Sequence, residues 1–251
     1  MVSINKKCHE KVLPKRIILV RHGESLVNED ETVLEHIPNH KIKLSQTGRS
    51  QAQITASEIL DIISPGSRLL FYVSPSSRTR ETAQEIVSRV PKERVGGVRE
   101  ECRLREQHFG NFQEVEERRK IKSTRNTYGK FFYRVPQGES SADVYDRVSS
   151  FIEGLWRDME GNKLNCDDQE LNLVVVSHGL TILLFLMKWF NWTVNEFEAL
   201  ANPSNCECRV MQLGENGEYS LALHHKPEDL KQWGLSEEMI RDQMIRASKS
   251  Y

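Results

Sequence analysis

The chain has 251 residues, of which 38% are hydrophobic and 28% charged, and its formal net charge is −1. This is an ordinary globular composition, long enough for one α/β domain with a full core or for two small domains. The near-neutral balance excludes a general basic surface for nucleic acid and an acidic tail. Any anion must therefore be bound by local arginines.

The sequence shows no sign of secretion or membrane insertion. Its first residues, MVSINKKCHEKVLPKR, contain no apolar run of signal-peptide length. The most apolar stretch, residues 180–187, is too short to cross a bilayer and predicts a buried helix. The cysteines are scattered at a spacing that offers no metal site, so reduced packing cysteines are expected. We therefore expect a cytoplasmic protein with no membrane partner.

Strands and helices are predicted to alternate along the chain. Strands are expected at residues 16–20, 69–73, 171–176, 207–213 and 219–224, and helices at about 46–63, 83–90, 144–159, 180–190 and 236–247. The helices follow from apolar residues spaced three and four apart. The segment 171–176 is nearly all apolar, which is typical of a strand buried on both faces.

This alternation predicts an α/β fold, a three-layer α/β/α sandwich around a mostly parallel central sheet. No repeat or Pro/Gly/Ser-rich linker divides the chain. We therefore expect a single catalytic domain over residues 1–251 with its core at about 16–225. A short polar N-terminal extension would precede the core, and a peripheral C-terminal helical tail would follow it.

Three predicted strands end in polar motifs: Arg21-His22, the stretch SPSSR that ends at Arg78, and Ser177-His178-Gly179. In parallel sheets, ligands bind outside the carboxyl ends of the strands. Each residue alone has an ordinary explanation: His22 in a turn, Arg78 solvated at a helix start, His178 as a satisfied buried histidine. Those explanations do not predict that all three residues share a strand-end position.

The chemistry that these residues suggest is phosphoryl transfer. An imidazole nitrogen of His22 can attack phosphorus and form a phosphohistidine, provided that a partner fixes its neutral tautomer. The guanidinium groups of Arg21 and Arg78 can bind the non-bridging oxygens, and His178 can add a further donor. Backbone N–H groups where a helix begins near residues 23–26 suit the same anion.

The reaction also needs a proton donor for the leaving oxygen. Glu106, in the loop-like segment RLREQHFGNFQ, is the candidate because neighbouring aromatics can desolvate it. The alternative is an ordinary surface glutamate. Because arginines can neutralise the phosphate and no carboxylate cluster with metal-ligand spacing is visible, we expect neither a metal nor a cofactor.

Five motifs follow one another in the chain: RHGESLVN, SPSSRTRETA, LREQHFGNFQ, GESSADVYDRV and VVVSHG. In this order they resemble the phosphoglycerate mutase-like branch of the histidine phosphatase superfamily, and most closely its plant and fungal phosphoglycerate mutase-like proteins. The resemblance extends from about residue 16 to residue 206 and implies the phosphoglycerate mutase-like fold. It assigns the following roles: nucleophile His22, phosphate ligands Arg21 and Arg78, second pocket histidine His178, and proton donor Glu106.

The resemblance also concerns residues beside the predicted pocket. Asn28, at the end of RHGESLVN, matches a position that often contacts the phosphate. Glu139 and Ser140 match a signature that precedes the next helix, where their role can be structural.

The family contains both phosphatases and mutases. The interval from Gly110 to Glu139 is short compared with the insertion in sugar-acid mutases, and a short lid admits water. The residue sequence LREQHFG nevertheless resembles the corresponding segment of mutases. We predict a phosphatase acting on a small phosphorylated metabolite, such as a sugar phosphate or phosphoglycerate. A mutase and a non-catalytic binding protein are the alternatives, and the intact set of site residues argues against the second.

The segment 116–137 is rich in cations and aromatics. It can be a lid that recognises a second anionic group of the substrate, or a solvated helix followed by a packing segment. A nucleic-acid patch is a third interpretation, against which the overall neutrality argues. The sequence leaves this choice open, as it does the oligomeric state.

Overall fold

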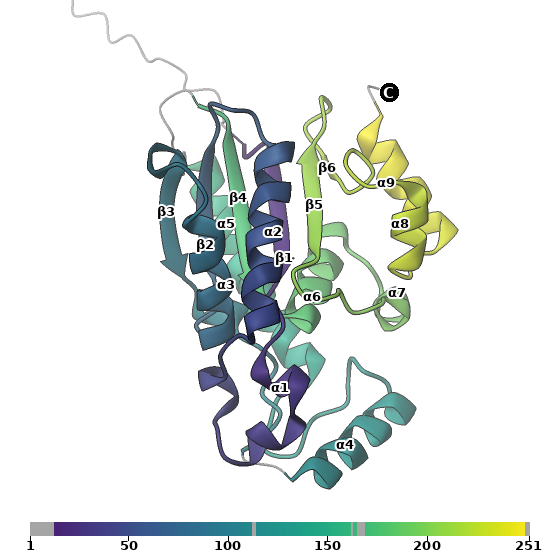
Figure 1. The fold of residues 1–251 in the computed structure, drawn as a ribbon. Helices are drawn as coiled ribbons and strands as arrows, with labels where there is room; N and C mark the ends of the chain where they lie inside the picture. The colour runs from purple at the N-terminus through teal and green to yellow at the C-terminus, as the bar shows by residue number, and fades with distance from the viewer. Residues whose placement is uncertain (1–12, 112–113, 162, 165–168, 249–251) are drawn as a thin grey trace, which may run out of the picture.

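The computed structural model describes residues 13–111, 114–161, 163–164 and 169–248 (Figure 1). The predicted N-terminal extension falls mostly on residues 1–12, which lie outside this part of the chain. The strands are β1 Arg16–Arg21, β2 Arg68–Val73, β3 Val95–Glu100, β4 Leu171–Ser177, β5 Cys208–Leu213 and β6 Tyr219–Ser220. They form one sheet in the order β3-β2-β4-β1-β5-β6.

The helices connect these strands. The α-helices are α1 Leu26–Glu29, α2 Gln46–Ile62, α3 Ser77–Val87, α4 Val115–Tyr128, α5 Ser141–Glu160, α6 Gly179–Phe190, α7 Val194–Ala199, α8 Pro227–Gln232 and α9 Glu237–Ala247. The 3₁₀ helices are η1 Glu31–Glu35, η2 Asn39–Lys41, η3 Lys92–Arg94 and η4 Cys102–Leu104. Among the described residues, no helix is long and apolar enough to cross a membrane.

The centre of the sheet is parallel, as predicted. Strand β4 is buried along its whole length and pairs in parallel with β1 on one side and β2 on the other. Arg21 is opposite Ser177, and Val73 is opposite Val176, so these strands end at one edge of the sheet. Strands β5 and β6 extend the sheet in antiparallel pairing.

Helices cover both faces of the sheet, so the predicted three-layer sandwich is confirmed (Figure 1). Because successive strand residues point to opposite faces, Ile17 and Leu19 join one core with residues of α5 and α6. Ile18 and Val20 join the other core, with residues of α2 and α3. Helices α8 and α9 also contribute apolar side chains to the first core, so the C-terminal residues help to cover the sheet.

Two strand predictions need correction. Strand β3 was not predicted, because it is an exposed edge strand that begins Val95-Gly96-Gly97 and shows no apolar run. The strand expected at residues 219–224 ends at Ser220. There the Ser220 hydroxyl and the Leu221 N–H donate to Gln243 of α9, which turns the chain away from the sheet.

Helix α4 contains most of the cations of segment 116–137. It buries none of its residues and lies away from the sheet (Figure 1). Its first N–H donates to the Glu35 carboxylate of η1, 3.3 Å away. Beyond the helix, Phe131 and Val135 are buried. The segment is thus an exposed helix followed by residues that pack against the body.

Candidate active site

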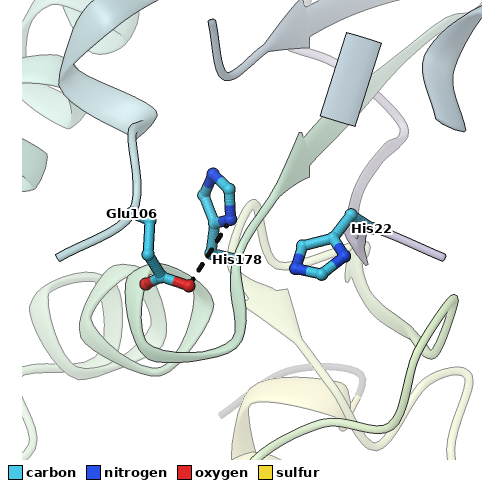
Figure 2. A group of neighbouring side chains, drawn as sticks. All are labelled: His22, Glu106 and His178. Atoms are coloured by element: carbon cyan, nitrogen blue, oxygen red, sulfur yellow. Dashed lines mark ion pairs between the residues drawn. The ribbon is translucent and has the colours of Figure 1, made fainter. Parts of the chain in front are cut away.

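The three polar strand ends meet at one place. His22 follows β1 and His178 follows β4, and their ring centroids are 5.3 Å apart (Figure 2). The sheet hydrogen bonding continues one step past the strands, since the His22 N–H donates to Ser177 O and the Ser74 N–H to Val176 O. The backbone that presents both imidazoles is therefore held by the sheet itself.

The turn after β1 depends on a close contact between two glycines. A Cβ atom on Gly23 would lie 2.5 Å from the carbonyl oxygen of Gly48 in α2. No larger residue fits here without moving the backbone. The Gly23 N–H donates to the hydroxyl of Thr82, and the amide of Asn205 donates to the His22 carbonyl. This packing explains why glycine follows the histidine directly.

Arg78 connects the two histidines. Its side chain is only 3% exposed, and its Nε–H donates to His22 Nε2 at 3.1 Å. One terminal nitrogen lies 3.2 Å from His178 Nδ1, and the other donates to the Asn39 carbonyl at 2.7 Å. The start of α3 therefore places one cation between both imidazoles.

These contacts determine the tautomers of the two histidines. A guanidinium can only donate, so His22 Nε2 and His178 Nδ1 both accept. The proton of His22 then lies on Nδ1, 2.7 Å from Gly23 O, and that of His178 lies on Nε2, 2.7 Å from Ser74 Oγ. Burial, and after it the charge of Arg78, holds the pKa of each histidine well below its usual value. Both imidazoles are neutral.

Arg21 is the second cation of the site. One terminal nitrogen donates to the Pro203 carbonyl at 2.5 Å. Its Nε–H is buried and meets no acceptor among the described residues. Burial lowers the pKa of Arg21, and the negative charge of Glu106 opposes that shift. Arg21 therefore keeps a donor free for an anion in the cavity that it lines.

Glu106 reaches the same cluster from the loop after η4. Its Oε2 lies 3.5 Å from His178 Nδ1 (Figure 2). The same oxygen lies 4.0 Å from a terminal nitrogen of Arg78. The side chain is 21% exposed, so water reaches the carboxyl group. Its neighbours are the buried Arg78 and His178, which an ordinary surface glutamate would not contact.

Arg147 of α5 holds the backbone of this loop. Its guanidinium donates to the carbonyl oxygens of Arg103, Arg105 and Glu106, at 2.6, 2.8 and 3.2 Å. It also forms an ion pair with Glu139 at 3.0 Å. Glu139 thus connects α5 to the loop, which accounts for its place in the motif GESSADVYDRV.

Asn28 lies at the cavity wall, but its side-chain oxygen is already hydrogen-bonded to the neighbouring Ser25. Its Oδ1 accepts from both the backbone N–H and the hydroxyl of Ser25, at 2.9 Å each, which caps α1. The carboxamide nitrogen is the part of this side chain that remains for a ligand. Ser140 caps α5 in the same way, together with Asp143.

His22, Glu106 and His178 also have ligand atoms within 4.8 Å of one another, close enough for a metal ion. The imidazole nitrogens that would bind it already accept from Arg78. A cation there would displace the guanidinium and face its charge. The donor set therefore suits an anion better than a metal.

The cluster forms the floor of a cavity of about 750 Å³. Arg21, His22, Arg78 and Glu106 line its inner end, and residues of α1, η1, η2, α4 and the loop 105–111 line the rest. The structure thus brings all the sequence-predicted site residues together. His178 is in contact with Arg78 but is fully buried and is not among the residues that line the cavity.

Three residues of the site were not predicted. Ser74, which contacts His178, occupies a strand-end position and could have been found by the same rule as His22. Asn39 contributes a backbone carbonyl, and Arg147 acts from a distant helix. Neither has a local signal in the sequence.

The fold and the cluster define a phosphoryl-transfer enzyme. The sequence model of the histidine phosphatase superfamily (branch 1) matches residues 17–225. The chain therefore belongs to the histidine phosphatase superfamily, which confirms the resemblance seen in the five motifs.

Known relatives agree with this assignment. The chain is 56% identical to the phosphoglycerate mutase-like protein AT74 of Arabidopsis thaliana, over 95% of this chain and 77% of that protein. It is 30% identical to the broad-range acid phosphatase DET1 of Saccharomyces cerevisiae, over 81% and 86%. Among solved structures, mycobacterial glucosyl-3-phosphoglycerate phosphatase is 25% identical with a TM-score of 0.60, covering 79% of this chain and 90% of that one.

Proposed function

We propose that this enzyme is a phosphatase that hydrolyses monoesters of small phosphorylated metabolites through a phosphohistidine on His22, without a metal ion. The observation that carries the proposal is the tautomer of His22. Gly23 O holds the proton on Nδ1, so the lone pair of His22 lies on Nε2 at the floor of the cavity. In the free enzyme this lone pair accepts from Arg78, and it becomes available when the Arg78 N–H donates to a phosphoryl oxygen instead. A neutral, oriented imidazole nitrogen is the form that attacks phosphorus.

In the first step His22 Nε2 forms a bond to phosphorus and the bond between phosphorus and the ester oxygen breaks. Arg21 and Arg78 bind the non-bridging oxygens and stabilise the negative charge of the transition state. Protonated Glu106 gives its proton to the leaving oxygen, so the product is a neutral alcohol. The enzyme then carries a phosphohistidine and a Glu106 carboxylate.

In the second step water attacks the phosphohistidine. The Glu106 carboxylate takes a proton from the water as the new phosphorus–oxygen bond forms. The phosphorus–nitrogen bond breaks, which returns its electron pair to His22 Nε2. Inorganic phosphate leaves, and both residues regain their starting forms. The partial exposure of Glu106 supports this step, because water must reach it.

His178 and Asn28 have supporting roles in the proposal. His178 Nδ1 accepts from Arg78 in the free enzyme, so it can donate to a phosphoryl oxygen only after that nitrogen gains a proton. An anion beside the imidazole favours that protonated form. Asn28 would add a neutral donor through its carboxamide nitrogen.

Hydrolysis, rather than transfer back to substrate, is supported by the short interval between Gly110 and Glu139. The acid phosphatase among the relatives points the same way, whereas AT74 is named only as mutase-like. Supplying 3-phosphoglycerate separates the two activities. A phosphatase releases phosphate, and formation of 2-phosphoglycerate without phosphate would identify a mutase.

The central test is hydrolysis of p-nitrophenyl phosphate in the presence of EDTA. We expect the wild-type enzyme and His36→Ala, a surface histidine control, to be active, and His22→Ala to be inactive. Acid-labile, base-stable label from a ³²P-ester should appear on the wild type and on His36→Ala but not on His22→Ala. Activity that persists in His22→Ala, or that EDTA abolishes, would refute the mechanism.

Glu106→Gln tests the proton donor. Its kcat should fall much more for an alkyl phosphate than for p-nitrophenyl phosphate, because p-nitrophenolate leaves without a proton. An equal fall on both substrates would remove Glu106 from that role.

A further inference from the structure

The outer half of the cavity has a wall of apolar side chains. Val27, Leu34, Ile37 and Pro38 come from the segment α1–η2, and Phe109 comes from the loop that follows Glu106. We call these five residues the apolar wall. They line the same cavity as the phosphate-binding groups, so a phosphate ester bound at His22 extends past them.

The apolar wall lies outside the two hydrophobic cores. Val27, Leu34, Ile37 and Phe109 belong to neither of the two hydrophobic cores that the described residues form. Ile37 is 38% exposed, although it is a large aliphatic side chain. Apolar surface held open beside a reactive centre gains free energy when a ligand covers it.

The two arginines that line the outer half, Arg105 and Arg118, each contact a group of the protein. Arg105 forms a 2.6 Å ion pair with Glu139, a carboxylate that it shares with Arg147. Arg118 of α4 donates to the Glu31 carbonyl at 3.3 Å. A second phosphate or a carboxylate would compete with these partners, whereas an apolar group needs no free donor.

We infer that the preferred substrates are phosphate monoesters of apolar alcohols, with an alkyl chain or aromatic ring that packs against the apolar wall. This inference rests on the proposed phosphatase function and names its substrate class. It replaces the sugar phosphate or phosphoglycerate expected from sequence with an ester whose alcohol is hydrophobic.

A homologous series of esters tests the inference. Ethyl, butyl and hexyl phosphate carry the same reacting group and differ only in apolar length. We expect kcat/KM to rise about threefold for each methylene that enters the cavity, close to the value for full burial. Hexyl phosphate should also exceed 3-phosphoglycerate in kcat/KM.

Substitutions in the wall should reduce that length dependence. In Leu34→Ser and Ile37→Ser, the ratio of kcat/KM for hexyl to ethyl phosphate should fall about tenfold. Ile54→Ser is the matched control, because Ile54 is an exposed isoleucine on α2 outside the cavity. It should keep the wild-type ratio. A ratio unchanged in both wall variants would contradict the role of the wall.

The outcomes separate this inference from the proposed function. A flat or falling series, or a preference for 3-phosphoglycerate, overturns the substrate class while release of phosphate upholds the phosphatase. If no ester is hydrolysed and no label reaches His22, the proposed function and this inference both fail.

Discussion

The two halves of the cavity are built differently. In the inner half, His22, Arg78 and His178 are 4%, 3% and 0% exposed, and the sheet and α3 hold them in place. In the outer half, the walls come from the short helices α1, η1 and η2 and from α4, which buries no residue. The difference shows that the cluster of histidines and Arg78 is held by long-range packing, whereas the outer walls are built from short local segments.

Removing the central cation should have the largest effect. Arg78→Met deletes the donors to both histidines and the positive charge next to Glu106. We expect kcat/KM for p-nitrophenyl phosphate to fall about 10³-fold, as for loss of a transition-state donor. Arg80→Met, on the exposed side of α3, is the control and should behave as wild type. A loss of only a few fold in Arg78→Met would show that the inner half tolerates rearrangement.

The buried histidines should make stability depend on pH. Their folded-state pKa values lie well below the unfolded value of about 6.5, so the unfolded chain binds more protons below that pH. The free energy of unfolding therefore does not depend on these two histidines above about pH 6.5, and it falls as the pH decreases below that value. Together the two histidines should account for about 2.7 kcal/mol per pH unit once both titrate in the unfolded chain.

Urea denaturation between pH 7.5 and 4.5 measures this dependence. On unfolding, the double variant His22→Asn/His178→Asn should take up about two protons fewer than the wild type. His225, whose pKa burial lowers to about 3, contributes equally to both proteins and cancels in the comparison. Identical slopes would show that the inner imidazoles take up protons in the folded enzyme.

Arg147 tests how firmly the proton donor is held. In Arg147→Met the loop loses its three carbonyl contacts, so Glu106 should move. We expect kcat for an alkyl phosphate to fall about 30-fold, and that for p-nitrophenyl phosphate much less. The control is Arg157→Met on the exposed side of α5. A parallel loss on both substrates would indicate general destabilisation instead.

Asn28 lies at the border between the halves and should give the smallest effect. Asn28→Asp keeps an oxygen to cap α1 but replaces the carboxamide donor with a negative charge. We expect kcat/KM to fall about tenfold with little change in the melting temperature. If only stability changes, Asn28 belongs to the helix cap and not to the phosphate site.

Much of the inner half could be predicted from the sequence. The strand-end rule locates His22, Arg78 and His178, because an apolar run that stops at a charged residue is visible locally. Glu106 has no such signal: its loop-like segment and neighbouring aromatics made it a candidate, and the resemblance between motifs then implied the role of proton donor. The tautomers, which carry the mechanism, follow from the three-dimensional position of Arg78.

Elements without an apolar pattern were missed or misjudged. Strand β3 is exposed on most of its residues and has two glycines directly after its first residue, Val95, so only its pairing with β2 defines it. Strand β6 is cut short by Gln243, which is 23 residues away from Ser220. The apolar wall is invisible in the sequence, because its residues are scattered among polar ones and face a cavity that folding creates.

The position of β1 has a consequence for synthesis of the chain. Strand β1, which precedes His22, is the first strand of the sheet to be made, yet its partners β4 and β5 lie more than 140 residues later. A nascent chain that ends before β4 lacks both strands that pair with β1. The sheet around His22 can therefore form only after β5 has been synthesised, and chains that end before β4 are expected to be inactive.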